Sequence, residues 1–218
     1  MPLSLTGEGL LFYLRNQMTT QLEVLNHVIG VVGETPVSNV NSQHPTAQSA
    51  LLTITRVSKQ FQLRGWWFNR EERLTLSPSV GGEIVIPSTT LKIDPVDTSS
   101  KLVWRGTRLY DSLNHTYNIG TSVMVNMNLL LPTNELPEVA AMYLMHKSAY
   151  DFYVADDGDP EKAQALLFES DKAYADVKAQ QIQMSNVNAK LRPVTAYLRA
   201  GLRQFGGSYN PTYPGGGN

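Results

Sequence analysis

LNHVIGVVGETPVS (residues 25–38) and RGWWFN (residues 64–69) bound the stretch of sequence that decides the fold. Apolar residues recur at three- and four-residue steps up to Gly33, which predicts a helix with Thr20 as a possible N-cap. Gly33 is placed to stop this helix, and Pro36 bars its continuation. A second helix is predicted with Pro45 in its first turn and Gly65 as its C-terminal cap. The predicted inward faces are Leu22, Leu25, Ile29 and Val32, then Ala50, Ile54, Val57 and Phe61, with Arg56, Lys59 and Arg64 directed outward.

After Gly65 the apolar residues alternate with a period of two, which is typical of half-buried strands. In the first predicted strand Trp66 and Phe68 share a face and are expected to form the seam between sheet and helices. Trp67 lies on the opposite face and is a candidate for a contact between subunits. About six short strands without intervening helices favour an antiparallel sheet or small sandwich. The other predicted strands are residues 83–86, 90–93 and 123–131 and a hairpin of residues 101–105 and 107–111 across Gly106.

Helical periodicity returns at Pro137. Asp159, Pro160 and Glu161 are typical of an N-cap, a first-turn proline and an acidic first turn, so a last helix is predicted from there to about Asn188. The fold class is therefore α+β, a discontinuous antiparallel helical bundle with an inserted antiparallel β-sheet or sandwich. The predicted face of the helix after Pro137 is Val139, Met142, Tyr143, His146, Ala149, Tyr150 and Tyr153. The predicted parts are an arm (1–18), the bundle (19–65 and 134–189), the β region (66–133) and a C-terminal extension (190–218).

The composition excludes several classes of function. The 218 residues carry a formal net charge of −1, without the basic surplus of a dedicated nucleic-acid binder. The chain has no cysteine, which excludes disulfides, thiolate catalysis and Cys-ligated zinc. It begins without a basic, apolar leader and has no apolar run long enough for a bilayer, so we expect a soluble protein used in a cytoplasm.

No catalytic, cofactor-binding or metal site is predicted. Asp156, Asp157 and Asp159 flank a glycine but fail the twelve-residue EF-hand spacing, and favour an exposed turn. The four histidines have no metal-ligand spacing, and serine-hydrolase and nucleotide-binding motifs are absent. The acidic residues of the β region leave a glycosidase pair open as a minor alternative: Glu71, Glu72, Asp94 and Asp111.

The C-terminal extension interleaves basic and aromatic residues and contains no acidic one. This pattern is found both in nucleic-acid binders and in segments that become ordered on a protein partner. We favour the protein partner and expect the extension to be flexible in the free chain. Its basic residues are Lys190, Arg192, Arg199 and Arg203, and its aromatic ones are Tyr197, Phe205, Tyr209 and Tyr213.

The order of these features resembles the tail tubular protein A family of short-tailed bacteriophages. The resemblance covers about residues 20–185. It rests on an aliphatic helix that ends in a Gly-Glu-x-Pro-Val turn, a helix of roughly twenty residues, an Arg-Gly-Trp-x-Phe-Asn exit and a Pro-Glu helix start near residue 137. The residues that match the turn and the exit are Gly33, Glu34, Pro36 and Val37, and Arg64, Gly65, Trp66, Phe68 and Asn69.

The resemblance implies a structural virion protein of the phage tail that is assembled in the host cytoplasm. It implies a twelve-membered adaptor ring that joins the portal protein to the tail nozzle protein and extends the channel for genome DNA, without recognition of its sequence. We expect the motif residues to build the subunit. Trp67, Lys190, Arg192, Tyr197, Arg199, Arg203 and Phe205 are the candidates for portal and subunit contacts. A virion-associated polysaccharide- or wall-degrading hydrolase and a DNA-binding module that uses the basic C-terminal tail are the alternatives.

Overall fold

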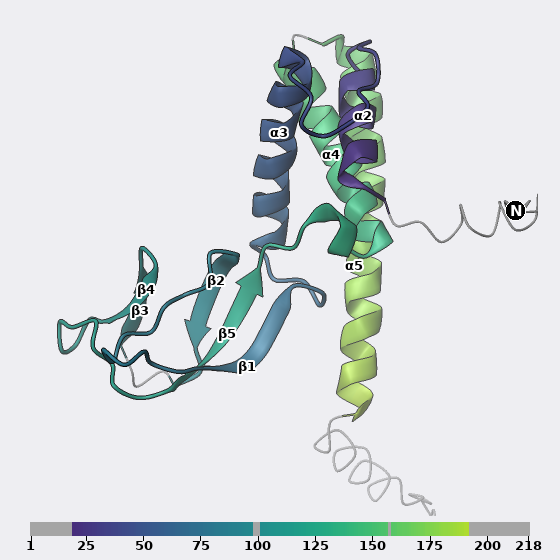
Figure 1. Ribbon diagram of the computed structural model, residues 1–218. Coiled ribbons are helices and arrows are strands. Elements are labelled where there is room, and N and C mark those ends of the chain that lie inside the picture. The colour runs from purple at the N-terminus through teal and green to yellow at the C-terminus, as the bar shows by residue number, and fades with distance from the viewer. Residues whose placement is uncertain (1–18, 98–100, 157, 192–218) are drawn as a thin grey trace, which may run out of the picture. The chain divides into compact units, whose positions relative to one another are not determined.

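The computed structural model describes residues 19–97, 101–156 and 158–191 (Figure 1). The chain divides into a unit that ends at Lys178 and a second that begins at Ala179. Helices precede and follow a β region, so the predicted α+β class is confirmed. The described elements are α2 (Gln21–Gly30), α3 (Pro45–Gln62), β1 (Arg70–Leu76), β2 (Thr90–Pro95), β3 (Leu102–Arg105), β4 (Arg108–Asp111), β5 (Val123–Leu129), a short 3₁₀ turn (Thr133–Glu135), α4 (Glu138–Ala155) and α5 (Pro160–Leu191).

The helix starts follow the local sequence. The Thr20 side chain accepts a hydrogen bond from the Glu23 amide while the Glu23 carboxylate accepts one from the Thr20 amide, which is a complete capping box. Asp159 Oδ2 accepts from the Lys162 amide at 3.2 Å, so the predicted cap of α5 is confirmed. Pro45 occupies the first turn of α3, where its missing N–H is not needed.

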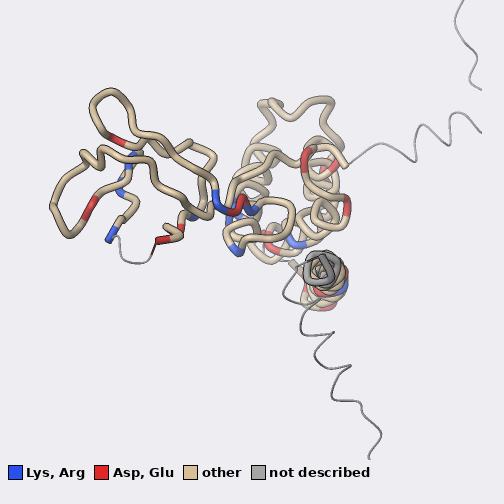
Figure 2. The backbone as a smooth tube through the Cα atoms, turned by 90° about the horizontal axis from the view of Figure 1, so that it is seen from below, with Lys and Arg blue, Asp and Glu red and all other residues tan. Residues whose placement is uncertain are grey.

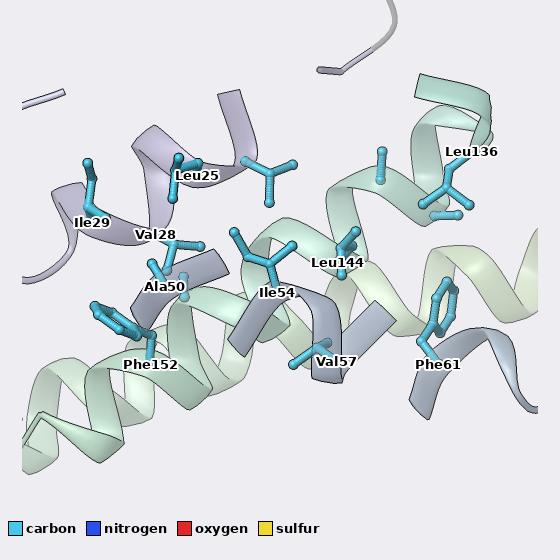
Figure 3. Close-up of a cluster of buried hydrophobic side chains, with 14 of the residues drawn as sticks. Leu25, Val28, Ile29, Ala50, Ile54, Val57, Phe61, Leu136, Leu144 and Phe152 are labelled. Atoms are coloured by element: carbon cyan, nitrogen blue, oxygen red, sulfur yellow. The ribbon is translucent and has the colours of Figure 1, made fainter. Parts of the chain in front are cut away.

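The helices from both sides of the β region share one hydrophobic core. Figure 3 shows side chains of α2, α3 and α4 that meet in it. The predicted face of α3 is confirmed, because Ala50, Ile54, Val57 and Phe61 are all buried. On α2 the buried residues are Val24, Leu25, Val28 and Ile29, whereas Leu22 and Val32, both predicted to face inward, are half-buried.

The predicted face of α4 was confirmed only in part, with Val139 and Tyr143 packed against the helical core. Of that set only Ala149 is buried, and the others are half-buried. Apolar residues surround most of this helix because it packs on α2 and α3 with one face and carries aromatic contacts to α5 on another. Periodicity alone therefore could not identify the innermost face. The residues buried on α4 are Ala140, Ala141, Leu144, Ser148, Ala149 and Phe152.

The β region forms two antiparallel sheets around a second core. In one sheet β5 lies between β1 and β2, and in the other β3 pairs with β4. The hairpin across Gly106 and the alternating strand at residues 123–129 are confirmed. Both sheets contribute to the core, so the sheets pack together as a small sandwich does. Its buried residues are Ile84, Ile86, Leu109, Val125 and Met127.

Two predicted strands are corrected. Residues 83–86 make only isolated bridges, Glu83 with Asn118 and Val85 with Arg108. Residues 66–69 are a turn and not the start of a strand, since β1 begins at Arg70. The alternation of aromatic residues there reflects their packing on the end of a helix and not a sheet face.

Candidate functional site

The Gly-Glu-Thr-Pro turn is closed by paired backbone hydrogen bonds. The Gly33 amide donates to the Gly30 carbonyl at 3.1 Å, and the Glu34 amide donates to the Ile29 carbonyl at 3.2 Å. Gly33 has φ +85°, the left-handed conformation that this Schellman arrangement requires. Glycine is therefore required at position 33 because other residues rarely adopt this backbone conformation.

Side chains then hold this turn against the two helices that it joins. Asn26 of α2 accepts from the Val37 amide at 2.8 Å and donates to the Val37 carbonyl at 3.1 Å. Glu34 accepts from the Thr46 hydroxyl at 3.1 Å, in the first turn of α3. Pro36 is exposed. Asn26 was not identified from the sequence, because a single polar residue in a helix gives no spacing signal.

Replacing Gly33 by Ala should lower the free energy of unfolding by about 1 kcal/mol, because a Cβ disfavours the left-handed conformation. Gly30→Ala is the matched control: a Cβ at either glycine meets nothing within 4 Å, and only Gly33 has positive φ. The control should leave stability unchanged or raise it by up to about 1 kcal/mol, because alanine favours helix. Urea denaturation of both variants measures the difference. Equal midpoints would contradict the backbone explanation.

The C-terminal end of α3 is capped by side chains from the RGWWFN segment. The indole Nε1 of Trp66 donates to the Phe61 carbonyl at 2.8 Å. Asn69 donates from Nδ2 to the Gln62 carbonyl at 2.8 Å and to the Leu129 carbonyl of β5 at 2.7 Å. Its Oδ1 accepts from the Trp66 amide at 2.8 Å. The Phe61 and Gln62 carbonyls at the end of α3 thus accept side-chain hydrogen bonds in addition to backbone ones.

Two more amide side chains tie this helix end to the sheet. Asn128 of β5 donates to the Leu63 carbonyl at 3.0 Å. Gln62 donates to the Leu131 carbonyl at 3.0 Å and accepts from the Leu131 amide at 2.8 Å. Both side chains are buried, so these bonds are shielded from water. We call Gln62, Gly65, Trp66, Asn69 and Asn128 together the helix–sheet joint.

An aromatic cluster packs beside the joint. The ring of Phe61 lies 5.0 Å from that of Trp66 and 4.6 Å from that of Tyr143. Tyr174 of α5 meets Trp66 edge to face at 6.0 Å and receives a hydrogen bond from Arg64. Burial raises the pKa of Tyr143, which keeps this phenol neutral. The motif residues thus hold three helices and a sheet in one arrangement.

The structure brings some of the predicted site residues together and leaves others apart. Gly65 and Trp66 belong to the joint, whereas Gly33, Glu34 and Pro36 form the separate turn after α2. Trp67 and Phe68 are both half-buried against the helical core, with ring centroids 5.0 Å apart. The prediction that they lie on opposite faces of a strand was therefore wrong. A subunit contact at Trp67 stays a prediction. Lys190 lies in the last turn of α5, and Arg192, Tyr197, Arg199, Arg203 and Phe205 lie outside the described residues.

The fold also brings together two histidines that are far apart in the sequence. His27 of α2 and His146 of α4 meet edge to face with ring centroids 5.5 Å apart. The Nε2 atom of His27 is buried and has no hydrogen-bond partner among the described residues. Burial, and secondarily the charge of His146, lower the pKa of His27 from its ordinary value of 6.5. Only the tertiary packing of α2 on α4 creates this pair.

The folded chain should lose stability as the pH falls below 6.5, because the unfolded state then binds a proton at His27 more readily than the folded state does. The contribution of neutral His27 to the free energy of unfolding is fully present above pH 6.5. It is lost as the pH falls from there toward the lower pKa of His27 in the folded chain. Melting temperatures at about pH 7.5 and about pH 5.5 measure the loss. His27→Gln should reduce the difference between the two pH values. His115→Asn, at an exposed position with φ +54°, should keep it. The same acid sensitivity in both variants would contradict the assignment.

Charged residues of the β region form ion pairs and hydrogen bonds at the surface. Lys92 pairs with Asp94 at 2.8 Å and Arg70 with Glu72 at 3.5 Å. Asp111 accepts from Asn114, which lowers the pKa of this carboxyl. Within the described ranges no group of three or more His, Asp or Glu residues is placed to hold a metal, and none of the helices there is long and apolar enough to cross a membrane. Figure 2 shows the two signs of charge interspersed along the described backbone.

Comparison with known proteins gives this architecture its context. The family model described as tail tubular protein matches residues 22–193, most of the chain and both sides of the β insertion. The chain belongs to the tail tubular protein family and is a structural component of a bacteriophage tail. It is 28% identical over 138 residues to tail tubular protein A of Klebsiella phage KP34, across 63% of this chain and 74% of that protein. The family predicted from the sequence is thus confirmed.

Proposed function

We propose that this chain is the subunit of an adaptor ring that joins the portal to the tail nozzle and extends the DNA channel. The family match supports a tail role. The observation that carries the adaptor role is the helix–sheet joint. Its buried hydrogen bonds fix the end of α3 to the β5 region. A force applied to the sheet is therefore transmitted to the helical bundle without bending at this connection. A connector between two larger assemblies needs such a stiff connection.

The parts of the chain have different roles in this proposal. The bundle of residues 19–65 and 134–189 forms the ring wall, in twelve copies, with the β region of residues 66–133 inserted in it. The extension of residues 190–218 holds the portal through its basic and aromatic residues, and the other face meets the nozzle protein. DNA passes through the channel without sequence recognition, which is consistent with the net charge of −1. Assembly takes place in the host cytoplasm.

Electron microscopy of the cognate portal rings incubated with this chain tests the proposal. The full-length chain should add a ring of density beneath each portal. A version truncated after Ala189 should lose that density if the extension provides the grip. Circular dichroism of the truncated chain shows whether the bundle is still folded. Bare portal rings with a folded, full-length chain would overturn the adaptor role.

A further inference from the structure

The outward face of α3 combines protruding leucines with positive charge. Leu52 is 73% exposed and Leu63 is 47% exposed. Arg56 and Lys59 fall between them at helical spacing, so the four residues form one stripe on the side away from the core. The helix contains no acidic residue in Pro45–Gln62. Arg56 is paired with Asp151 of α4 at 3.0 Å, whereas the Lys59 side chain has no hydrogen-bond or ion-pair partner among the described residues. This α3 stripe is therefore apolar and basic, and within the described residues Lys59 is its unpaired charge.

The first half of α5 carries a surface with the opposite character. Phe168 is 67% exposed and lines a shallow hollow together with Ala165 and Leu166. Glu161 and Glu169 line the same hollow, and neither has an ion pair or hydrogen bond within the described part of the chain. Lys162, which also lines the hollow, already donates a hydrogen bond to the Val31 carbonyl at 2.6 Å. The lining of the α5 hollow thus combines apolar side chains with two carboxylates that are unpaired within the described residues.

We propose that the α3 stripe of one copy of this chain docks in the α5 hollow of a second copy. Leu52 enters the hollow beside Phe168, and Lys59 faces the carboxylates of Glu161 and Glu169. The complementarity in charge favours a second copy as the occupant, since each copy carries both halves of the contact. Because the two surfaces differ, the contact is heterologous, and each bound copy leaves one of each surface free for the next. The inference rests on the proposed ring, for which it supplies a subunit interface.

The absence of cysteine in the chain makes a specific cross-linking test possible. Leu52→Cys and Phe168→Cys are prepared as separate full-length chains, one of them isotopically heavy, then mixed and treated with a short bis-maleimide. Mass spectrometry should find the heavy–light 52–168 link at about tenfold the yield of a Val80→Cys and Phe168→Cys control mixture, because docking raises the local concentration of the reacting pair. Val80 is exposed and lies outside both surfaces. Equal yields, or only 52–52 and 168–168 links, would overturn the inference.

Charge reversal tests the electrostatic half of the contact. Lys59→Glu in the Leu52→Cys chain should lower the 52–168 yield by roughly three- to tenfold, since attraction becomes repulsion between exposed groups. Glu161→Lys and Glu169→Lys in the Phe168→Cys chain should restore it. An unchanged yield, or no restoration, would overturn the choice of a second copy as the partner.

The test is run both on the free chain and on the portal-bound assembly, so that two failures can be told apart. A 52–168 link without added density on the portal supports this interface and counts against the adaptor role. Added density on the portal without the link, in either sample, overturns the interface and leaves the adaptor role standing.

Discussion

Replacing Asn69 by Ala should lower the free energy of unfolding by about 3 kcal/mol, because the Trp66 amide loses its acceptor and two carbonyls each lose a hydrogen bond in a buried site. Asn69 is 2% exposed. Its side chain accepts a hydrogen bond from the Trp66 amide and donates to the carbonyls of Gln62 and Leu129. Water has little access to a side chain buried to this extent, and its removal leaves a small cavity. The helix–sheet joint should therefore open before the rest of the bundle.

Urea denaturation followed by circular dichroism measures the loss, and Trp fluorescence reports the joint through Trp66. Asn114→Ala is the matched control, since Asn114 is exposed and Asp111 is the only hydrogen-bond partner of its side chain among the described residues. It should cost no more than about 0.5 kcal/mol. Asn69→Asp keeps the size of the side chain and removes the donor. If Asn69→Asp were as stable as the natural chain, hydrogen bonding at the joint could not be the source of the loss.

The sequence predicted the helices well where apolar residues cover one face only. The buried stripe of α3 and the caps at Thr20 and Asp159 depend on residues that are close in the sequence. Such features can be predicted without knowing how the helices pack. Helix α4 shows the opposite case, because contacts with several helices make it apolar nearly all round. The pair of His27 and His146 likewise depends on how two helices pack, which no spacing within either helix reveals.

The joint was predicted in part. Gly65, Trp66 and Asn69 lie in one short segment, and their order was recognised as a motif. Asn128 was missed, because the alternation of β5 places it on the face opposite to Val125 and Met127, where a polar residue is expected to meet water. It is nevertheless only 5% exposed, since the end of α3 lies against that face. The portal contacts remain a prediction because they fall on the C-terminal extension.

Gly65→Ala should lower the free energy of unfolding by about 2–4 kcal/mol, from backbone strain and a steric clash together. Gly65 has φ +75°, and a Cβ there would lie 2.6 Å from Nδ2 of Asn128. Asn128 cannot move aside without loss, because it is buried and holds the Leu63 carbonyl at 3.0 Å. The glycine is thus required by the approach of the sheet to the helix end as well as by its own conformation.

Gly106→Ala separates the two contributions to this loss. Gly106 also has positive φ, +59°, but a Cβ there meets nothing within 4 Å, so its replacement should cost only about 1 kcal/mol. A double-mutant cycle with Asn128→Ala then isolates the clash. In the Asn128→Ala background Gly65→Ala should cost no more than Gly106→Ala does, because the obstructing amide is gone. An equal cost in both backgrounds would assign the whole effect to the backbone and remove the clash from the argument.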